Sequence, residues 1–359
     1  MQVINKLLKL KKKYIFFILN FLFIIFFSTA SLYANAFKVS DIKISEPFEV
    51  NFDKNKAIDN GFRSAFINLL SMITTSGDRR KIKDTSLKEL KNMIDSFTVS
   101  DEKFIGDEYF ATLEVTFNKE NTLAFLENKN IFPSIPIRNK VLLIPILVDL
   151  ESDNVFFFTN NIFYQKWNNQ IKNHHLLEYL LPSEDLEELS IIQNNYRSIE
   201  DYDFQDFIKK YDLEDYIITI IYKNKGELKV FSKIKLKNSF KIDNQLFEKI
   251  ELNNEENFQI VLDKLKTVYE NYWKKNNQIN TSIKLPLTIL IKSNEYIKIQ
   301  ALEKTLNSLD LISDFYILKF DNENIYFRII YNGSPKTFLN DMKKRNFNLN
   351  VENNIWIIK

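Results

Sequence analysis

Hydrophobic residues recur along the chain with two spacings, one typical of helices and one of strands. Between a cap at Asp53 or Asn55 and Ile73, apolar side chains return every third or fourth residue, which predicts an amphipathic helix. From Tyr109 to Phe117, apolar and polar residues alternate, which predicts a half-buried strand. The N-terminal part of the chain is therefore expected to combine helix and sheet.

The other elements of this first module, residues 37–132, follow the same rules. We expect an opening strand between Phe37 and Val50, a second helix over Ser86–Ser96 and a third helix capped by Asn118. Small residues recur at every fourth position along the first helix: Ala57, Gly61 and Ala65. Because small side chains shorten the distance between packed elements, this row predicts a helix that lies close to the sheet.

The segment from Thr74 to Thr85 is polar and basic and predicts a loop. Its positive side chains are Arg79, Arg80, Lys81 and Lys83. We interpret them as a solvated connection, because the cluster is short. The alternative is a patch that contacts anionic surfaces.

A second module, residues 138–280, follows a proline-stiffened linker at 131–136. The apolar run from Val141 to Val148 predicts a strand covered on both faces. Pro145 lies inside this run and cannot donate a ladder hydrogen bond, which predicts an edge, a bulge or a bend there. Further elements are expected in this order: a short strand that ends at Leu180-Leu181-Pro182, a helix from Ser183, a helix over Asp203–Tyr211, strands over Tyr216–Tyr222 and Leu228–Leu236, and a helix over Asn254–Lys275.

An aromatic-rich segment follows the first strand of the second module. Its rings are Phe156, Phe157, Phe158, Phe163, Tyr164 and Trp167. Large rings of this kind dominate protein cores, so a core cluster is the favoured interpretation. A hydrophobic floor for a ligand is the alternative.

The third module, residues 281–359, is expected to alternate strand, helix, strand, strand, helix and strand. The predicted ranges are Leu285–Ile291, Glu295–Leu309, Ile312–Leu318, Ile325–Tyr331, Pro335–Arg345 and Leu349–Ile358. This order is that of a ferredoxin-like βαββαβ sandwich. The fold class predicted for the whole chain is therefore α+β, with three small mixed modules.

The first 36 residues have the pattern of a secretory signal peptide. Five lysines precede an apolar run from Tyr14 to Phe27, and the segment ends in Ala34-Asn35-Ala36, an A-x-A cleavage pattern. The run is shorter than the roughly 20 residues that a spanning helix needs. We expect export to the periplasm and a mature chain beginning near Phe37, the alternative being an uncleaved anchor in the inner membrane.

The net charge and the cysteine content limit which partners and which chemistry the chain can have. The formal charge of the chain is +2, and removing the five positive charges of the first 36 residues leaves −3. Nucleic acids are therefore not expected as partners, since phosphate binding needs clustered positive charge. The absence of cysteine excludes disulfides, thiol catalysis and thiolate metal sites.

Candidate chemistry is sparse. Glu184, Asp185 and Glu188 could do acid–base work, but acids at this position also stabilise a helix N-terminus. His174 and His175 are neighbours in sequence and form a poor chelating pair. We therefore predict no catalytic, cofactor-binding or metal-binding residue, no cofactor and no enzymatic activity.

Several short motifs resemble, in their order, the exported proteobacterial domain of unknown function 2066 family. They are Phe66–Leu70 after the small-residue helix, Glu102 before the Tyr109–Phe117 strand, Val141–Pro145, Leu181-Pro182 with Asp185, and Tyr211 before the strand at Tyr216. The segment Phe156–Trp167 contains mainly phenylalanine and tyrosine at its aromatic positions, whereas that family usually has more tryptophan there. The resemblance implies an envelope protein with no assigned active site.

These observations favour a non-catalytic periplasmic protein that binds other envelope proteins or assembles with copies of itself. Peripheral contact with the membrane stays open, and no small-molecule substrate is identified. One alternative is a carrier of a small apolar or lipidic ligand on Phe157, Phe163 and Trp167. Another is a hydrolase built on Glu184, Asp185 and Glu188.

Overall fold

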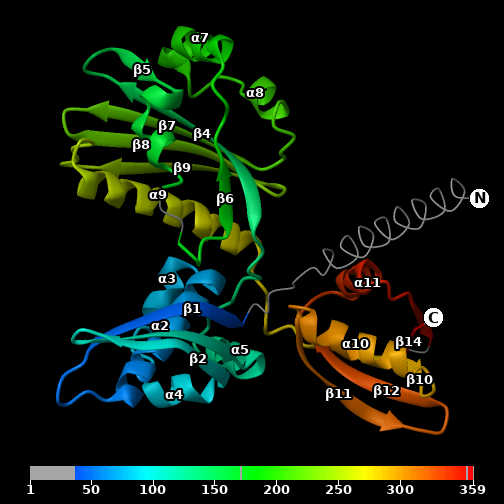
Figure 1. Cartoon of the computed structure of the whole chain (residues 1–359). Coiled ribbons are helices and arrows are strands. Elements are labelled where there is room, and N and C mark those ends of the chain that lie inside the picture. The colour runs from blue at the N-terminus through cyan, green and yellow to red at the C-terminus, as the bar shows by residue number, and fades with distance from the viewer. Residues whose placement is uncertain (1–36, 170–171, 353–354, 359) are drawn as a thin grey trace, which may run out of the picture. The chain divides into compact units, whose positions relative to one another are not determined.

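The computed structural model describes residues 37–169, 172–352 and 355–358 and has an α+β fold, as predicted. The expected signal peptide lies outside the described residues. The described strands form three sheets, and each predicted module contains one of them (Figure 1). The domain boundaries themselves stay a prediction.

The first module contains an antiparallel sheet in the order β1-β3-β2, packed against helix α2 (Figure 1). Its strands are β1 (Lys38–Pro47), β2 (Ile94–Ile105) and β3 (Glu108–Phe117). Its helices are α2 (Lys54–Ile73), α3 (Ser76–Arg79), η1 (Arg80–Ile82), α4 (Leu87–Asn92) and α5 (Lys119–Asn128). Asp53 caps α2 and Asn118 caps α5, as their sequences predict.

Two predictions for this module were wrong. The helix predicted over Ser86–Ser96 ends at Asn92, because the next residues pair with β3 as part of β2. The loop predicted over Thr74–Thr85 contains α3 and η1, and the Thr75 side chain caps α3 by accepting from the Asp78 N–H. A polar, basic composition therefore hid two short helical turns.

The central sheet has the order β5-β4-β7-β8-β9, and β6 pairs with β4 beside β5. Its strands are β4 (Asn139–Asp149), β5 (Asn154–Phe156), β6 (Leu177–Leu180), β7 (Tyr216–Asn224), β8 (Glu227–Leu236) and β9 (Ser239–Phe247). The helices of this module are η2 (Phe158–Asn160), α6 (Ile162–Lys166), α7 (Leu186–Asn195), η3 (Tyr196–Ser198), α8 (Gln205–Lys209) and α9 (Glu255–Asn276). Helix α9 covers one face of the sheet, and α7 and α8 cover the other (Figure 1).

Alternate residues of β4 enter two different hydrophobic cores. Val141 and Leu143 pack on the α9 side, and Leu142 and Ile144 pack on the α7 side. All four are fully buried, which confirms a strand covered on both faces.

Pro145 lies where β4 changes partner. β6 pairs with β4 up to Leu142 and β5 pairs from Leu147, so the edge between them has no strand partner. The Leu142 N–H donates toward β7, and strand alternation directs the Pro145 nitrogen to this opposite edge. The buried Asn161 side chain closes the gap by donating to the Pro145 carbonyl at 3.1 Å.

The central module departs from its prediction in three places. The short strand β5 was not predicted. The strand β9 was not predicted either, although it extends β8 by a regular antiparallel ladder. Helix α7 begins at Leu186 rather than Ser183, because the Asp185 side chain supplies the cap.

The third module contains a sheet in the order β11-β12-β10-β14-β13. Its elements are β10 (Leu285–Lys292), α10 (Tyr296–Ser308), β11 (Ile312–Phe320), β12 (Asn324–Tyr331), α11 (Pro335–Lys344), β13 (Leu349–Glu352) and β14 (Ile355–Ile358). The range predicted as one last strand, Leu349–Ile358, contains two strands, β13 and β14, that pair antiparallel, and β14 also pairs parallel with β10. The ferredoxin-like assignment of this module therefore stays a prediction.

The small-residue row of α2 faces the sheet. A Cβ atom on Gly61 would lie 2.8 Å from Ile44 Cδ1 and 2.9 Å from Leu113 Cδ2, both in buried side chains of β1 and β3. The predicted close approach of helix and sheet is thus present at this position.

We expect Gly61→Leu to lower the free energy of unfolding by about 3 kcal/mol, because the larger side chain overpacks a closed contact. Gly77→Leu is the matched control, since a Cβ on the exposed Gly77 meets nothing closer than Thr75 Oγ1 at 3.8 Å. Urea unfolding followed by circular dichroism measures both. Equal stability of the two variants would contradict the close approach.

Candidate functional site

A hollow of about 390 Å³ opens among α2, α3, η1, α4 and the segment that joins η1 to α4. Its floor consists of the apolar side chains Phe66, Leu70, Ile82 and Leu90, each at most 4% exposed. Ile67, which is 62% exposed, lines it on the solvent side. We call this feature the basic hollow; its lining is completed by Arg63, Arg79, Lys83 and Thr85.

The two arginines of the basic hollow donate hydrogen bonds to neutral groups. The Arg79 guanidinium donates to Ser71 Oγ at 2.6 Å, and the Arg63 guanidinium donates to the Thr85 carbonyl at 3.4 Å. Burial lowers the pKa of Arg79 below its usual value. The side of this hollow that carries charge is therefore positive.

Ser71 also connects Arg79 to a buried polar group on α9. The Lys274 Nζ donates to the Ser71 carbonyl at 2.5 Å and lies 3.8 Å from Glu270 Oε2. Burial lowers the pKa of Lys274 to about 8 and raises the pKa of Glu270. The other oxygen of Glu270 accepts the backbone N–H groups of Leu176 and Leu177 at 2.9 Å. These bonds anchor the start of β6 to α9.

The two histidines lie beside this group and do not form a metal site. Their rings are perpendicular, with centroids 5.1 Å apart. In the described part of the chain, no group of three His, Asp or Glu side chains is placed to hold a metal ion. Burial lowers the pKa of His174 to about 4 and that of His175 to about 3, and neighbouring cations act in the same direction. Both rings are therefore neutral at neutral pH.

The carboxylates considered for acid–base chemistry take part in a helix cap and an ion pair. Asp185 accepts the N–H of Glu187 at 2.9 Å and that of Glu188 at 3.3 Å. Glu188 is buried and accepts from Lys210 Nζ at 2.7 Å. Backbone donors, first that of Glu188, and the Lys210 ammonium lower the pKa of Asp185. Asp185 and Glu188 thus hold the start of α7 to α8, and a hydrolytic role for them stays untested.

The aromatic segment forms core. Phe157, Phe163 and Trp167 are each at most 1% exposed and pack in the two clusters on either side of the central sheet. The favoured interpretation of a core cluster is confirmed. These rings present no exposed floor to a ligand, so the alternative interpretation of this segment is wrong.

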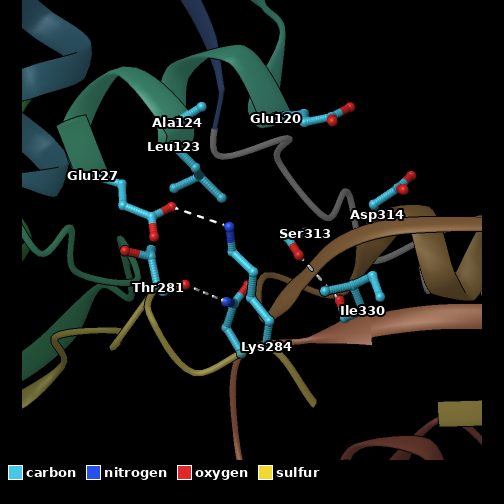
Figure 2. A pocket seen from close by; sticks show the side chains of 10 residues that line it. Glu120, Leu123, Ala124, Glu127, Thr281, Lys284, Ser313, Asp314 and Ile330 are labelled. Carbon is cyan, nitrogen blue, oxygen red and sulfur yellow. Dashed lines mark hydrogen bonds and ion pairs between the residues drawn. The ribbon is translucent and has the colours of Figure 1, made fainter. Parts of the chain in front are cut away.

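A smaller hollow, of about 220 Å³, is lined by α5, by residues before β10 and by β11 and β12 (Figure 2). Lys284 crosses it to pair with Glu127 at 3.3 Å, and the Asn332 amide donates to the Thr281 carbonyl at 3.1 Å. The only cation of this lining is thus occupied by an acid of the same lining.

The central sheet ends in an edge strand with an exposed apolar side. β9 pairs with β8 along its full length and has no strand on its other side within the described residues. Phe240, Ile242 and Leu246 alternate along it and are 56%, 50% and 56% exposed. Their partners across β8 are the lysines Lys235, Lys233 and Lys229. This edge is the second candidate site.

No family model matches the chain, and no curated protein matches it either. The resemblance to the domain of unknown function 2066 family therefore stays a prediction. Along the described residues, no helix is both long and apolar enough to cross a membrane.

Some residues of both candidate sites could be predicted from the sequence. Arg79 and Lys83 were recognised as a basic cluster, but Arg63 and the apolar floor come from residues before and after it. The alternation of Phe240, Ile242 and Leu246 after a turn at Lys237 was the signal that would have predicted β9.

The histidines predict a loss of stability in acid. Since their pKa values in the folded protein lie below the value of about 6.5 in an unfolded chain, the unfolded state binds more protons as the pH falls through 6.5 toward 4. The neutral histidines therefore cost the folded protein no stability above pH 6.5, and the free energy of unfolding decreases as the pH falls below that value. The charged groups that act on the two rings are Arg79, Lys172, Asp263, Lys266 and Lys274.

We expect the free energy of unfolding of the wild type to fall between pH 6.5 and 4.5 by about 2 kcal/mol more than that of a His174→Gln, His175→Gln variant. This is about half of what two full shifts would give, because both rings are only partly buried and solvent screens the effect. Denaturant unfolding of both proteins at several pH values measures the difference, and carboxylates common to both cancel. Parallel pH profiles would show that the rings are protonated equally in both states.

Proposed function

We propose that this protein is a non-catalytic assembly protein of the cell envelope that associates with a second copy of itself through β9. The observation that carries the proposal is the regular, unpaired edge of β9 with its exposed apolar residues. Soluble proteins usually protect such an edge with bulges, prolines or outward charges, because an exposed edge pairs readily with another strand.

The nine residues of β9 lack these protections on the exposed side. Its ladder with β8 has no register shift, and it contains no proline. The charged residues within it, Lys241 and Asp243, point to the other face, where they pair with each other at 2.7 Å. Strand β9 itself therefore carries none of these three protections on its unpaired edge.

The sequence of β9 also suits antiparallel pairing with the β9 strand of a second copy. In an antiparallel pair centred on Ile242, Lys241 of one copy lies opposite Asp243 of the other, and Phe240 lies opposite Asn244. Opposite charges across a pair stabilise it, whereas registers centred on Lys241 or Asp243 would place like charges together. A two-fold axis through Ile242 thus gives an isologous contact.

The envelope part of the proposal is supported by residues 1–36 of the sequence. Lysines, an apolar run of moderate length and an A-x-A pattern follow one another in the order that export requires. The lack of cysteine fits an oxidising compartment, where a free thiol would be oxidised.

We expect the wild type to dimerise, and Ile242→Lys to raise the dimer dissociation constant at least about tenfold by placing a charge on the unpaired edge. Ile297→Lys is the matched control, because Ile297 on α10 is 87% exposed. Sedimentation velocity over a concentration series measures the association. A wild type that stays monomeric at about 100 μM, or equal weakening by both variants, would refute assembly through β9.

We expect the exported protein to begin at Phe37, which intact mass spectrometry of the periplasmic fraction measures. Ala34→Leu with Ala36→Leu should block cleavage, because the peptidase requires small residues there, while Asn35→Leu should leave it intact. Recovery of full-length wild type from the cytosol would contradict the envelope location.

A further inference from the structure

The basic hollow carries positive charge without a matching acid among the described residues. Arg63, Arg79 and Lys83 line it, and the two arginines donate to neutral oxygens. Asp78 is occupied by Lys81 at 3.0 Å and by the Thr75 hydroxyl at 2.7 Å. Asp84 and Glu89 are close in sequence to lining residues, but both are exposed and neither lines the hollow.

Below these cations the surface is apolar. Phe66 and Leu70 come from one side of α2, Ile82 from η1 and Leu90 from α4, so three elements enclose the floor. A volume of about 390 Å³ lies within the usual range for small-molecule sites, about 300 to 1,000 Å³. A ligand that fits both parts has an apolar body and an anionic end.

Because the floor is recessed, the hollow favours a ligand with a single flexible chain over a flat surface such as a bilayer or a folded protein. The four floor residues are at most 4% exposed, so a flat bilayer surface or a folded partner would reach Ile67 but not them. A single flexible chain could enter and bury apolar area, which stabilises the complex by about 0.8 kcal/mol for each CH₂ removed from water.

We propose that the basic hollow binds a single-chain anionic amphiphile. Its acyl chain lies on Phe66, Leu70, Ile82 and Leu90, and its carboxylate or phosphate binds Arg63, Arg79 and Lys83. Guanidinium groups recognise either anion through paired charge-assisted hydrogen bonds. Ser71 holds Arg79 in place before the ligand binds, which reduces the entropy lost on binding.

This site is independent of β9, since it belongs to the first module. Free fatty acids and anionic single-chain phospholipids share the required chemistry. Laurate and monododecyl phosphate represent the two headgroups, and dodecanol represents the same chain without charge.

The test is isothermal titration calorimetry of the purified protein with each ligand below its micelle concentration. We expect saturable binding of laurate, of monododecyl phosphate or of both at one site per chain, and at least about tenfold weaker binding of dodecanol. An Arg63→Gln, Lys83→Gln variant should weaken binding of the anion by at least about tenfold. Arg80→Gln with Lys88→Gln removes the same charge from exposed positions outside the hollow and should change affinity less than about twofold.

A second variant separates binding from folding. Ile67→Glu places a negative charge at an exposed position of the lining, so we expect lost affinity with an unchanged urea unfolding midpoint. The proposal is overturned if dodecanol binds as tightly as laurate, if both double variants weaken binding equally, or if no saturable site is found. It is also overturned if anionic phospholipid vesicles bind and laurate does not compete, because the membrane surface is then the ligand.

Discussion

The burial of β4 and β7 on both faces is the constraint from which the central module follows. Their side chains are apolar at successive positions, so each face needs its own cover, and α9 on one side with α7 and α8 on the other supply it. The cover on the α7 side does not extend to β9, where Phe240 and Ile242 are half exposed. The same arrangement that closes the middle of the sheet thus leaves its last strand open, and the proposed interaction surface lies there.

Long periodic elements were predictable because their pattern is repeated many times. α2 and α9 have a cap residue and several buried turns, and β3 alternates along its whole length, so local and tertiary preferences agree. Short elements were not predictable in this way. α3 and η1 each contain a single turn, and Leu349–Ile358 divides into two strands whose pairing depends on β10. Tertiary contacts decide such segments, and a single sequence does not contain them.

The candidate sites were less predictable than the fold. A basic cluster in sequence indicated Arg79 and Lys83, but only the packing of α2 against η1 and α4 adds Arg63 and an apolar floor beneath them. The aromatic segment showed the opposite case. Rings that looked suited to a ligand, such as Trp167, fill the core instead, because the sheet needs large side chains beneath α9. In both segments the residue types suggested a binding site, but only the burial of each side chain showed whether a ligand can reach it.

The change of partner along β4 has a consequence for how the chain can vary. β5 runs antiparallel to β4 and β6 runs parallel to it, yet both pair with the same edge of β4, one on each side of Pro145. The segment that connects them therefore leaves and rejoins one edge, and its length does not set the strand order. Since the entropy of closing such an excursion rises only slowly with length, insertions there would be tolerated in evolution more readily than insertions between β7 and β8, whose tight turn at Gly226 fixes their register.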